Sequence, residues 1–155
     1  MEIRPYVEQD ADAVWEMLRP VFRAGDTYCI DPEISREAAL EFWAGGNHSA
    51  FVAGDAGTYY ICPNQAGGGA HVCNCGFVTG VPGKGVARAM LEHALAEAER
   101  RGYRAMQFNF VVETNARALD IWFRAGFAEV GRLPGAFHHP ERGYVDALVL
   151  YKSLV

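Results

Sequence analysis

The chain has 155 residues, which is the usual length of one domain and too short for two. Half of the residues are apolar and 21% are charged, so the chain can bury a core and is not a disordered tail, a collagen-like fibre or a low-complexity linker. The formal net charge of −5, without a cluster of Lys and Arg, argues against nucleic-acid binding.

No apolar run reaches the roughly 18 residues that a membrane span requires, and the opening MEIRPYVEQD lacks the pattern of a signal peptide. We therefore expect a soluble cytoplasmic protein, with a single domain over residues 1–155 and no membrane partner. The cysteines are too sparse for a disulfide scaffold, and no second close pair of ligands completes a zinc site. We expect buried thiols and no metal at Cys29, Cys62, Cys73 and Cys75.

In the first half of the chain, the pattern predicts a strand, two helices and then three strands. Asp10 and Ser35 are the expected N-caps of the two helices. The stretch Asp55-Ala56-Gly57 is the expected turn between the second and third strands. The expected elements are a strand at Glu2–Arg4, helices at Asp10–Phe22 and Ser35–Trp43, and strands at Ser49–Ala53, Thr58–Cys62 and His71–Val78.

The second half alternates more clearly between helices and strands. Its first helix closes on Arg100 and Arg101, with Gly102 as a left-handed cap. Strands separated by helices indicate an α/β sheet, and the hairpins make it mixed. The expected elements are helices at Val86–Arg101 and Asn115–Ala125 and strands at Arg104–Val112, Ala128–Arg132 and Tyr144–Tyr151.

A glycine-rich loop, GFVTGVPGKGVARAM, joins a strand to the helix that starts at Val86. Such a loop leaves backbone N–H groups free at the positive end of a helix dipole, which suits a phosphate or pyrophosphate. The alternative is a tight joint without a ligand. The loop lacks the Gly-Lys-Ser/Thr ending of a P-loop, and Arg88 stands where a dinucleotide-binding loop has glycine or alanine.

The loop segment PGKGVA, at Pro82–Ala87, resembles the Gln/Arg-x-x-Gly-x-Gly/Ala motif of the GNAT superfamily of acetyl-CoA-dependent N-acetyltransferases. NARALDIWFRAGF, at Asn115–Phe127, resembles the second hallmark of that family, an Asn-led helix closing on Gly-Phe. The resemblance implies a mixed sheet of about six or seven strands with about four helices, splayed between the fourth and fifth strands. It also makes a homodimer plausible, although no sequence feature marks an interface.

The same resemblance implies a set of residues that bind acetyl-CoA. The backbone amides of the loop would hold the pyrophosphate of coenzyme A, and three further side chains would line its path. The implied residues are Gly83, Lys84, Gly85, Val86 and Ala87 in the loop, with Val78, Asn115 and Trp122. Two positions depart from the family pattern. Pro82 replaces Gln or Arg, and Trp122 replaces the Tyr that many members use to protonate the departing thiolate, which an indole cannot do.

Four stretches narrow the resemblance to a subgroup that acetylates L-azetidine-2-carboxylate and related proline analogues. They are GDTY (25–28), PNQ (63–65), QFNFVVETN (107–115) and GRLPGAFHHPERGYVDALVLYK (131–152). The implied acceptor is a small amino or imino acid, or a toxic amine, acetylated directly in a ternary complex. A coenzyme A-binding module with little turnover and an acetyltransferase of proteins or peptides are the alternatives.

Two asparagines are the candidate catalytic and acceptor-binding residues. Asn74 and Asn109 lie within apolar strands, where an amide is disfavoured and needs partners. An amide can donate to a thioester or carboxylate oxygen without titrating. The structural alternative is that each amide only satisfies nearby backbone. Asp26, Tyr28 and Phe137 are the other candidate acceptor contacts.

The sequence leaves the general base open. The strand AHVCNCGFV carries no carboxylate, although many family members have a Glu base there. The remaining candidates are His71, Glu113 and Asp26, and a water relay is an equal alternative.

Overall fold

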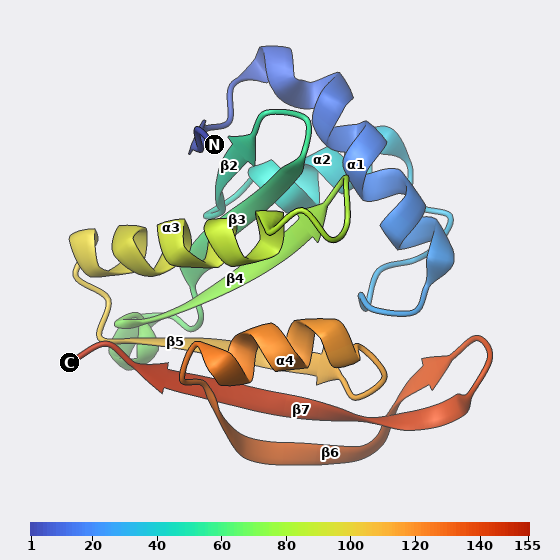
Figure 1. Cartoon of the computed structure of the whole chain (residues 1–155), viewed down its shortest axis with the longest axis vertical. Coiled ribbons are helices and arrows are strands. Elements are labelled where there is room, and N and C mark those ends of the chain that lie inside the picture. Colours follow the sequence, from blue (N-terminus) through green and yellow to red (C-terminus); the bar gives the residue numbers. More distant parts are fainter.

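The computed structural model describes residues 1–155 and contains a seven-stranded sheet in the order β1-β2-β3-β4-β5-β7-β6 (Figure 1). The strands are β1 (Arg4–Pro5), β2 (Ser49–Ala53), β3 (Gly57–Pro63), β4 (Val72–Thr79), β5 (Ala105–Val112), β6 (Ala128–His139) and β7 (Gly143–Ser153). The helices are α1 (Ala11–Ala24), α2 (Arg36–Ala44), α3 (Val86–Arg100) and α4 (Ala116–Arg124), with 3-10 turns at Glu8–Asp10 and Gly67–Gly69. The predicted mixed α/β fold is confirmed.

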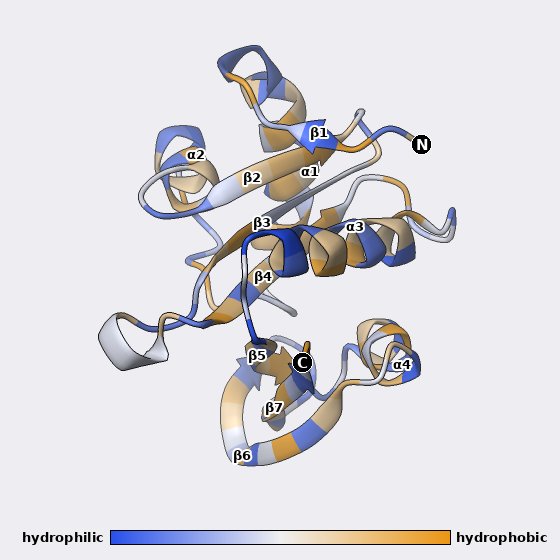
Figure 2. Cartoon of the chain, turned by 90° about the vertical axis from the view of Figure 1, so that its left-hand side faces the viewer, coloured by the Kyte–Doolittle hydropathy of each residue, from blue (hydrophilic) through white to orange (hydrophobic).

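The two faces of the sheet carry separate cores. One core joins a face of the sheet to α3 and α4, and the other joins the opposite face to α1 and α2. Figure 2 shows α3 and α4 on one side of the sheet and α2 on the other. Because side chains alternate along a strand, β3 sends Tyr59 and Ile61 into the first core and Tyr60 and Cys62 into the second. No helix has the length and apolar character that a membrane span requires.

Several helix ends follow the expected local chemistry. The hydroxyl of Ser35 accepts a hydrogen bond from the N–H of Ala38 at 3.1 Å, so Ser35 caps α2 as predicted. Gly102, just beyond α3, has a φ of +83°. Asp10 does not cap α1, because its carboxylate instead binds the guanidinium of Arg4 and the N–H of Val7.

Two predicted strands have wrong bounds. β1 lies at Arg4–Pro5 instead of Glu2–Arg4. β6 continues seven residues beyond the predicted end at Arg132, to His139. β6 is an exposed edge strand, so it lacks the apolar alternation that marks a half-buried strand. Pro134 falls within a break in the β6–β7 register, which is where an edge strand tolerates proline.

The sheet splits between its fourth and fifth strands, as the family resemblance implied. β4 and β5 are parallel, and only two residue pairs join them, Val72 with Ala105 and Cys73 with Met106. Beyond these pairs β4 continues to Thr79 while β5 turns toward β7 (Figure 1). The edge of β4 that faces β5 therefore has no strand partner along most of its length, whereas the other edge is paired with β3.

Candidate active site

A cavity of about 450 Å³ fills the gap where β4 and β5 diverge. Its walls are the facing parts of these strands, the start of α4 and the loop between α1 and α2. Of its 21 lining residues, 15 are hydrophobic. The strands contribute Asn74–Thr79 and Phe108–Val112, and the α1–α2 loop contributes Thr27–Ile30. The other lining residues are Val21, Phe42, Tyr60, Asn115, Ala118 and Trp122.

No Asp, Glu, His, Lys or Arg side chain lines this cavity. Its polar side chains are uncharged amides, hydroxyls and thiols. They belong to Asn74, Asn109, Asn115, Tyr28, Tyr60, Thr27, Thr79, Cys29 and Cys75. The cavity can therefore offer hydrogen bonds to a ligand but no ion pair, and its apolar walls disfavour an ammonium group.

Side chains satisfy the open edge of β4 inside the cavity. The N–H of Cys75 donates to the side-chain Oδ1 of Asn74 at 2.9 Å. The hydroxyl of Tyr28 accepts from the N–H of Phe77 at 2.9 Å and donates to the carbonyl of Phe77 at 2.8 Å. These backbone groups belong to the part of β4 that β5 no longer pairs. A ligand that binds along this edge must therefore replace the Asn74 and Tyr28 contacts.

Asn74 and Tyr28 thus lie in the cavity, and each has a group that can donate a hydrogen bond. The side-chain nitrogen of Asn74 has no hydrogen-bond partner, so it is free to donate to a ligand. Burial strongly raises the pKa of Tyr28, with the neighbouring Tyr60 adding to the effect, so the hydroxyl stays protonated.

Asn109 also lines the cavity, but it is exposed, contrary to the prediction of a buried amide. Its Oδ1 accepts from Nε2 of Gln107 at 2.9 Å, and its Nδ2 donates to Oδ1 of Asn64 at 2.7 Å. The face of β5 that carries Asn109 lies beyond the cover of α1 and α2, whose core includes no β5 residue. Both polar groups of Asn109 are therefore engaged in a chain of amides at the mouth of the cavity.

The glycine loop lies outside the cavity, between the end of β4 and the start of α3. Gly83 and Gly85 have φ values of +78° and +73°, and a Cβ on either would meet no protein atom within 4 Å. Lys84 is exposed, whereas Val86 is buried and packs in the α3 core. The loop therefore exposes backbone at the N-terminus of a 15-residue helix, an arrangement that suits an anion.

Three of the other expected coenzyme A contacts lie in the cavity. Val78 is buried at the end of β4, and Asn115 stands at the start of α4 with no side-chain capping bond. Trp122 is 7% exposed, and its ring centroid lies 5.1 Å from those of both Phe77 and Phe108. Asn115 and Trp122 form the α4 side of the cavity, whereas Val78 packs in the core of α1 and α2 on the other face of β4.

Two expected acceptor residues are not brought into the cavity. Asp26 belongs to the α1–α2 loop but does not line the cavity, whereas its neighbours Thr27 and Tyr28 do. Phe137 on β6 packs in a separate small cluster with Val112 and Val145. Phe137 therefore reaches the cavity only through neighbours such as Phe110, whose ring centroid lies 6.2 Å away.

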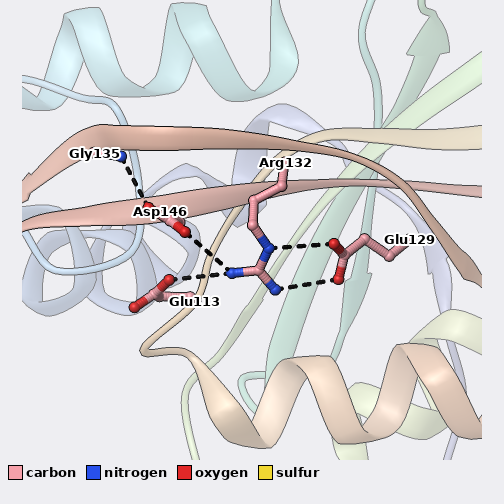
Figure 3. A network of polar contacts seen from close by, with 5 residues as sticks. All are labelled: Glu113, Glu129, Arg132, Gly135 and Asp146. Atoms are coloured by element: carbon pink, nitrogen blue, oxygen red, sulfur yellow. Dashed lines mark hydrogen bonds and ion pairs between the residues drawn. The ribbon is translucent and has the colours of Figure 1, made fainter.

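The candidate bases Glu113 and His71 also lie outside the cavity. Figure 3 shows the Glu113 carboxylate at the guanidinium of Arg132, at 3.3 Å, together with Glu129 and Asp146. His71 is exposed just before β4, at the end that is paired with β5. Neither side chain is placed to take a proton from a ligand in the cavity, and no cluster of His, Cys, Asp or Glu is arranged to hold a metal ion.

The geometry is that of a split sheet with a glycine loop leading into a helix, and the comparisons agree with it. A model of the acetyltransferase (GNAT) family matches residues 11–127. The chain belongs to this GNAT family. The family consists of acetyltransferases, so acetyl-CoA is the co-substrate against which the residues of the site are compared.

Individual relatives support the assignment to GNAT. N-acetyltransferase aca1 of Schizosaccharomyces pombe is 35% identical over 101 residues, which are 60% of this chain and 46% of that protein. The match thus spans about half the length of that relative. The structure of a GCN5-related N-acetyltransferase from Kribbella flavida is 37% identical, with a TM-score of 0.92, and the match covers 99% of this chain and 97% of that one.

A more distant GNAT structure shares the fold alone. It is a phosphinothricin acetyltransferase from Sinorhizobium meliloti in complex with acetyl-CoA, with 18% identity and a TM-score of 0.84. The match covers 98% of this chain and 87% of that one. The residues of the present chain fit the same co-substrate, because the unpaired edge of β4 and the open glycine loop offer backbone groups to an extended, phosphate-bearing ligand.

Tyr60 is a lining residue that the sequence did not single out. It lies opposite Gly76 across β3 and β4, and a tyrosine in an apolar strand is indistinguishable by pattern from plain core. Only the pairing of the strands and the divergence of β5 show that this side chain reaches the cavity.

Proposed function

We propose that the protein transfers an acetyl group from acetyl-CoA to the amine of a small amino or imino acid, directly in a ternary complex. The observation that carries the proposal is the cavity at the split of the sheet, which is small, largely apolar and free of charged side chains. Its volume of about 450 Å³ suits a thioester arm and a small acceptor together.

The proposed coenzyme A contacts come from the loop, from the end of β4 and from the α4 side of the cavity. The backbone N–H groups of Gly83–Ala87 bind the pyrophosphate at the positive end of α3. Val78, Asn115 and Trp122 contact the arm that enters the cavity. When bound, acetyl-CoA supplies a thioester carbonyl carbon that an amine can attack.

The acceptor side of the proposed site works without an ionised base. An ammonium with a pKa of about 10 is mostly protonated at neutral pH, but apolar surroundings lower that pKa and favour the reactive neutral amine. Asn74 donates from its free side-chain nitrogen to an oxygen of the reacting groups, and Asn109 contributes at the mouth. The amine nitrogen bonds to the acetyl carbon, the carbon–sulfur bond breaks, and the amine proton reaches the sulfur through water, since Trp122 cannot donate it.

The proposed acceptor class is that of cyclic imino acids such as L-azetidine-2-carboxylate. The resemblance of four stretches of this chain to the proline-analogue subgroup supports that choice. The uncharged cavity also fits a compact acceptor better than a basic peptide, whose cations would find no partner inside.

The test is the release of free thiol from acetyl-CoA with a panel of amino acids, imino acids including L-azetidine-2-carboxylate, polyamines and basic peptides. Asn74→Ala should lower turnover at least tenfold while acetyl-CoA still binds, because the variant removes a donor to the reacting groups. Asn47→Ala, in an exposed loop, is the matched control and should leave turnover unchanged. Acetyl-CoA binding without turnover on any acceptor would favour the coenzyme A-binding module instead.

A further inference from the structure

Tyr60 differs from every other tyrosine near the cavity in that its hydroxyl has no partner. The side chain is 7% exposed and lines the cavity. Tyr28 nearby exchanges two hydrogen bonds with Phe77, and the adjacent Tyr59 pairs with Nδ1 of His93 at 2.7 Å. No fully buried polar side-chain atom in the structure lacks a partner, so the Tyr60 hydroxyl keeps accessible surface and is free to donate to a ligand in the cavity that its side chain lines.

Aromatic neighbours hold the Tyr60 ring in place. The His48 ring stacks on it at a centroid distance of 3.9 Å and an interplanar angle of 7°. Trp43 meets it edge-on at 4.9 Å, and Phe42 does so at 5.9 Å. The hydroxyl is therefore presented by a ring with little freedom to move, as a specific hydrogen-bond donor requires.

The backbone of β4 makes room for this ring. Tyr60 lies directly opposite Gly76, and a Cβ at position 76 would come within 2.4 Å of the ring carbon Cε2. Only glycine at this position lets the ring lie across β4 and reach the cavity. Burial raises the pKa of Tyr60, so the hydroxyl keeps its proton and can donate it in a hydrogen bond.

The Tyr60 ring lies on the α1–α2 face of the sheet, away from Trp122 on the α4 side. Tyr60 belongs to the core of α1 and α2, whereas Trp122 belongs to that of α3 and α4. Asn74, with its free side-chain nitrogen, lies two residues from Gly76 on the same face of β4 and is a diagonal neighbour of Tyr60. Two uncharged donors on neighbouring strands thus line the cavity, which contains no Arg or Lys side chain.

We infer that the Tyr60 hydroxyl donates a hydrogen bond to the carboxylate of the acceptor, beside the amide of Asn74. The inference rests on the proposed function and deepens it, because it makes Tyr60 the residue that distinguishes an amino or imino acid from a simple amine. Uncharged donors can satisfy a carboxylate without an ion pair, and a hydrogen bond to a charged group is stronger than one between neutral groups.

The test compares two ligands that differ only in the carboxylate, L-azetidine-2-carboxylate and azetidine. Their binding to the protein in the presence of coenzyme A is measured by calorimetry for the wild type and for Tyr60→Phe. We expect the variant to bind L-azetidine-2-carboxylate about tenfold more weakly or worse, and azetidine no differently from the wild type. Tyr144→Phe, which removes a phenol that is 75% exposed outside the cavity, is the matched control.

Three results would overturn the inference. The first is equal affinity of wild type and Tyr60→Phe for L-azetidine-2-carboxylate. The second is an equal loss of affinity for L-azetidine-2-carboxylate and for azetidine in the variant. The third is no binding of L-azetidine-2-carboxylate by the wild type. An unchanged melting temperature and unchanged acetyl-CoA affinity show that the variant is folded. Thiol release from acetyl-CoA separates this inference from the proposed function. If the protein acetylates amines but Tyr60→Phe binds the carboxylate ligand as the wild type does, the proposed function stands and the role of Tyr60 is wrong. If the wild type binds the carboxylate ligand through Tyr60 but shows no turnover, the binding site stands and the proposed function is wrong.

Discussion

At the scale of the residue, Tyr28 shows how a side chain satisfies a strand edge that has no strand partner. Its hydroxyl bonds both backbone groups of Phe77, while its ring packs against Phe22 and Trp43 at centroid distances of 5.6 and 6.1 Å. Tyr28→Phe keeps the ring packing and removes both hydrogen bonds. The two bonds are worth about 1 kcal/mol each, reduced where cavity water replaces them.

We therefore expect Tyr28→Phe to lower the free energy of unfolding of the ligand-free protein by about 1–2 kcal/mol, measured by urea denaturation. Tyr144→Phe, on the exposed surface of β7, is the control and should change it little. Equal stability of wild type and Tyr28→Phe would show that these hydrogen bonds contribute nothing in solution.

The position of some residues can be predicted from nearby sequence, whereas that of others depends on distant segments of the chain. Asn74 lines the cavity, because strand alternation sets which face of β4 carries it and the divergence of β5 opens the space beside it. Glu113 was a candidate base because it follows a strand, yet it pairs with Arg132, which is 19 residues away in sequence. No local pattern could identify that partner.

At the scale of the element, the N-terminus of α3 is the part of the proposed site that depends most on glycine. Gly85 is its N-cap residue with a φ of +73°, and no protein atom lies near the position of an added Cβ. In the free protein, Gly85→Ala should therefore cost only the strain of a left-handed alanine, about 1–2 kcal/mol. The proposed pyrophosphate contact adds a second effect, because the new methyl group would stand among the loop amides.

We expect Gly85→Ala to weaken acetyl-CoA binding at least tenfold by calorimetry. Gly102→Ala, just beyond the other end of α3, is a matched control, since its φ is +83° and its surroundings are equally open. The control should lose similar stability and keep its acetyl-CoA affinity. If both variants bind acetyl-CoA as the wild type does, the loop is only a joint between strand and helix.

At the scale of the whole molecule, a charge network ties the β6–β7 hairpin to the end of β5. Arg132 on β6 contacts Glu113 beyond β5 and Asp146 on β7, and Asp146 also accepts the N–H of Gly135 at 2.9 Å (Figure 3). The Gly135 hydrogen bond, followed by Arg132, holds the pKa of Asp146 below its ordinary value of 3.8.

A carboxyl group whose pKa is lower in the folded than in the unfolded protein stabilises the fold above its unfolded pKa, and this contribution disappears as the pH falls through the folded pKa. We therefore expect Asp146→Asn to melt at a lower temperature than the wild type at pH 7. The difference should shrink below about pH 4 and vanish at still lower pH. Asp55→Asn, whose carboxylate makes no hydrogen bond or ion pair, is the control. A difference that stays the same at all pH values would assign the effect to packing instead of charge.

The sequence alone was sufficient for the features that arise from neighbouring residues and from strand alternation. The cap at Ser35, the glycine at the end of α3, the β2–β3 hairpin and the glycine loop all depend on contacts within a few positions of the chain. The paired motifs of the glycine loop and α4 then led to the GNAT family.

Only the tertiary structure decided which side chains meet in the cavity. Asn109 lines the cavity but is exposed at its mouth, Phe137 lies outside it, and Tyr60 reaches it through its pairing with Gly76. The physical reason is that burial and hydrogen-bond partners depend on which segments cover a strand face and where two strands part. Those segments lie far apart along the chain, so local sequence patterns cannot predict which of them come into contact.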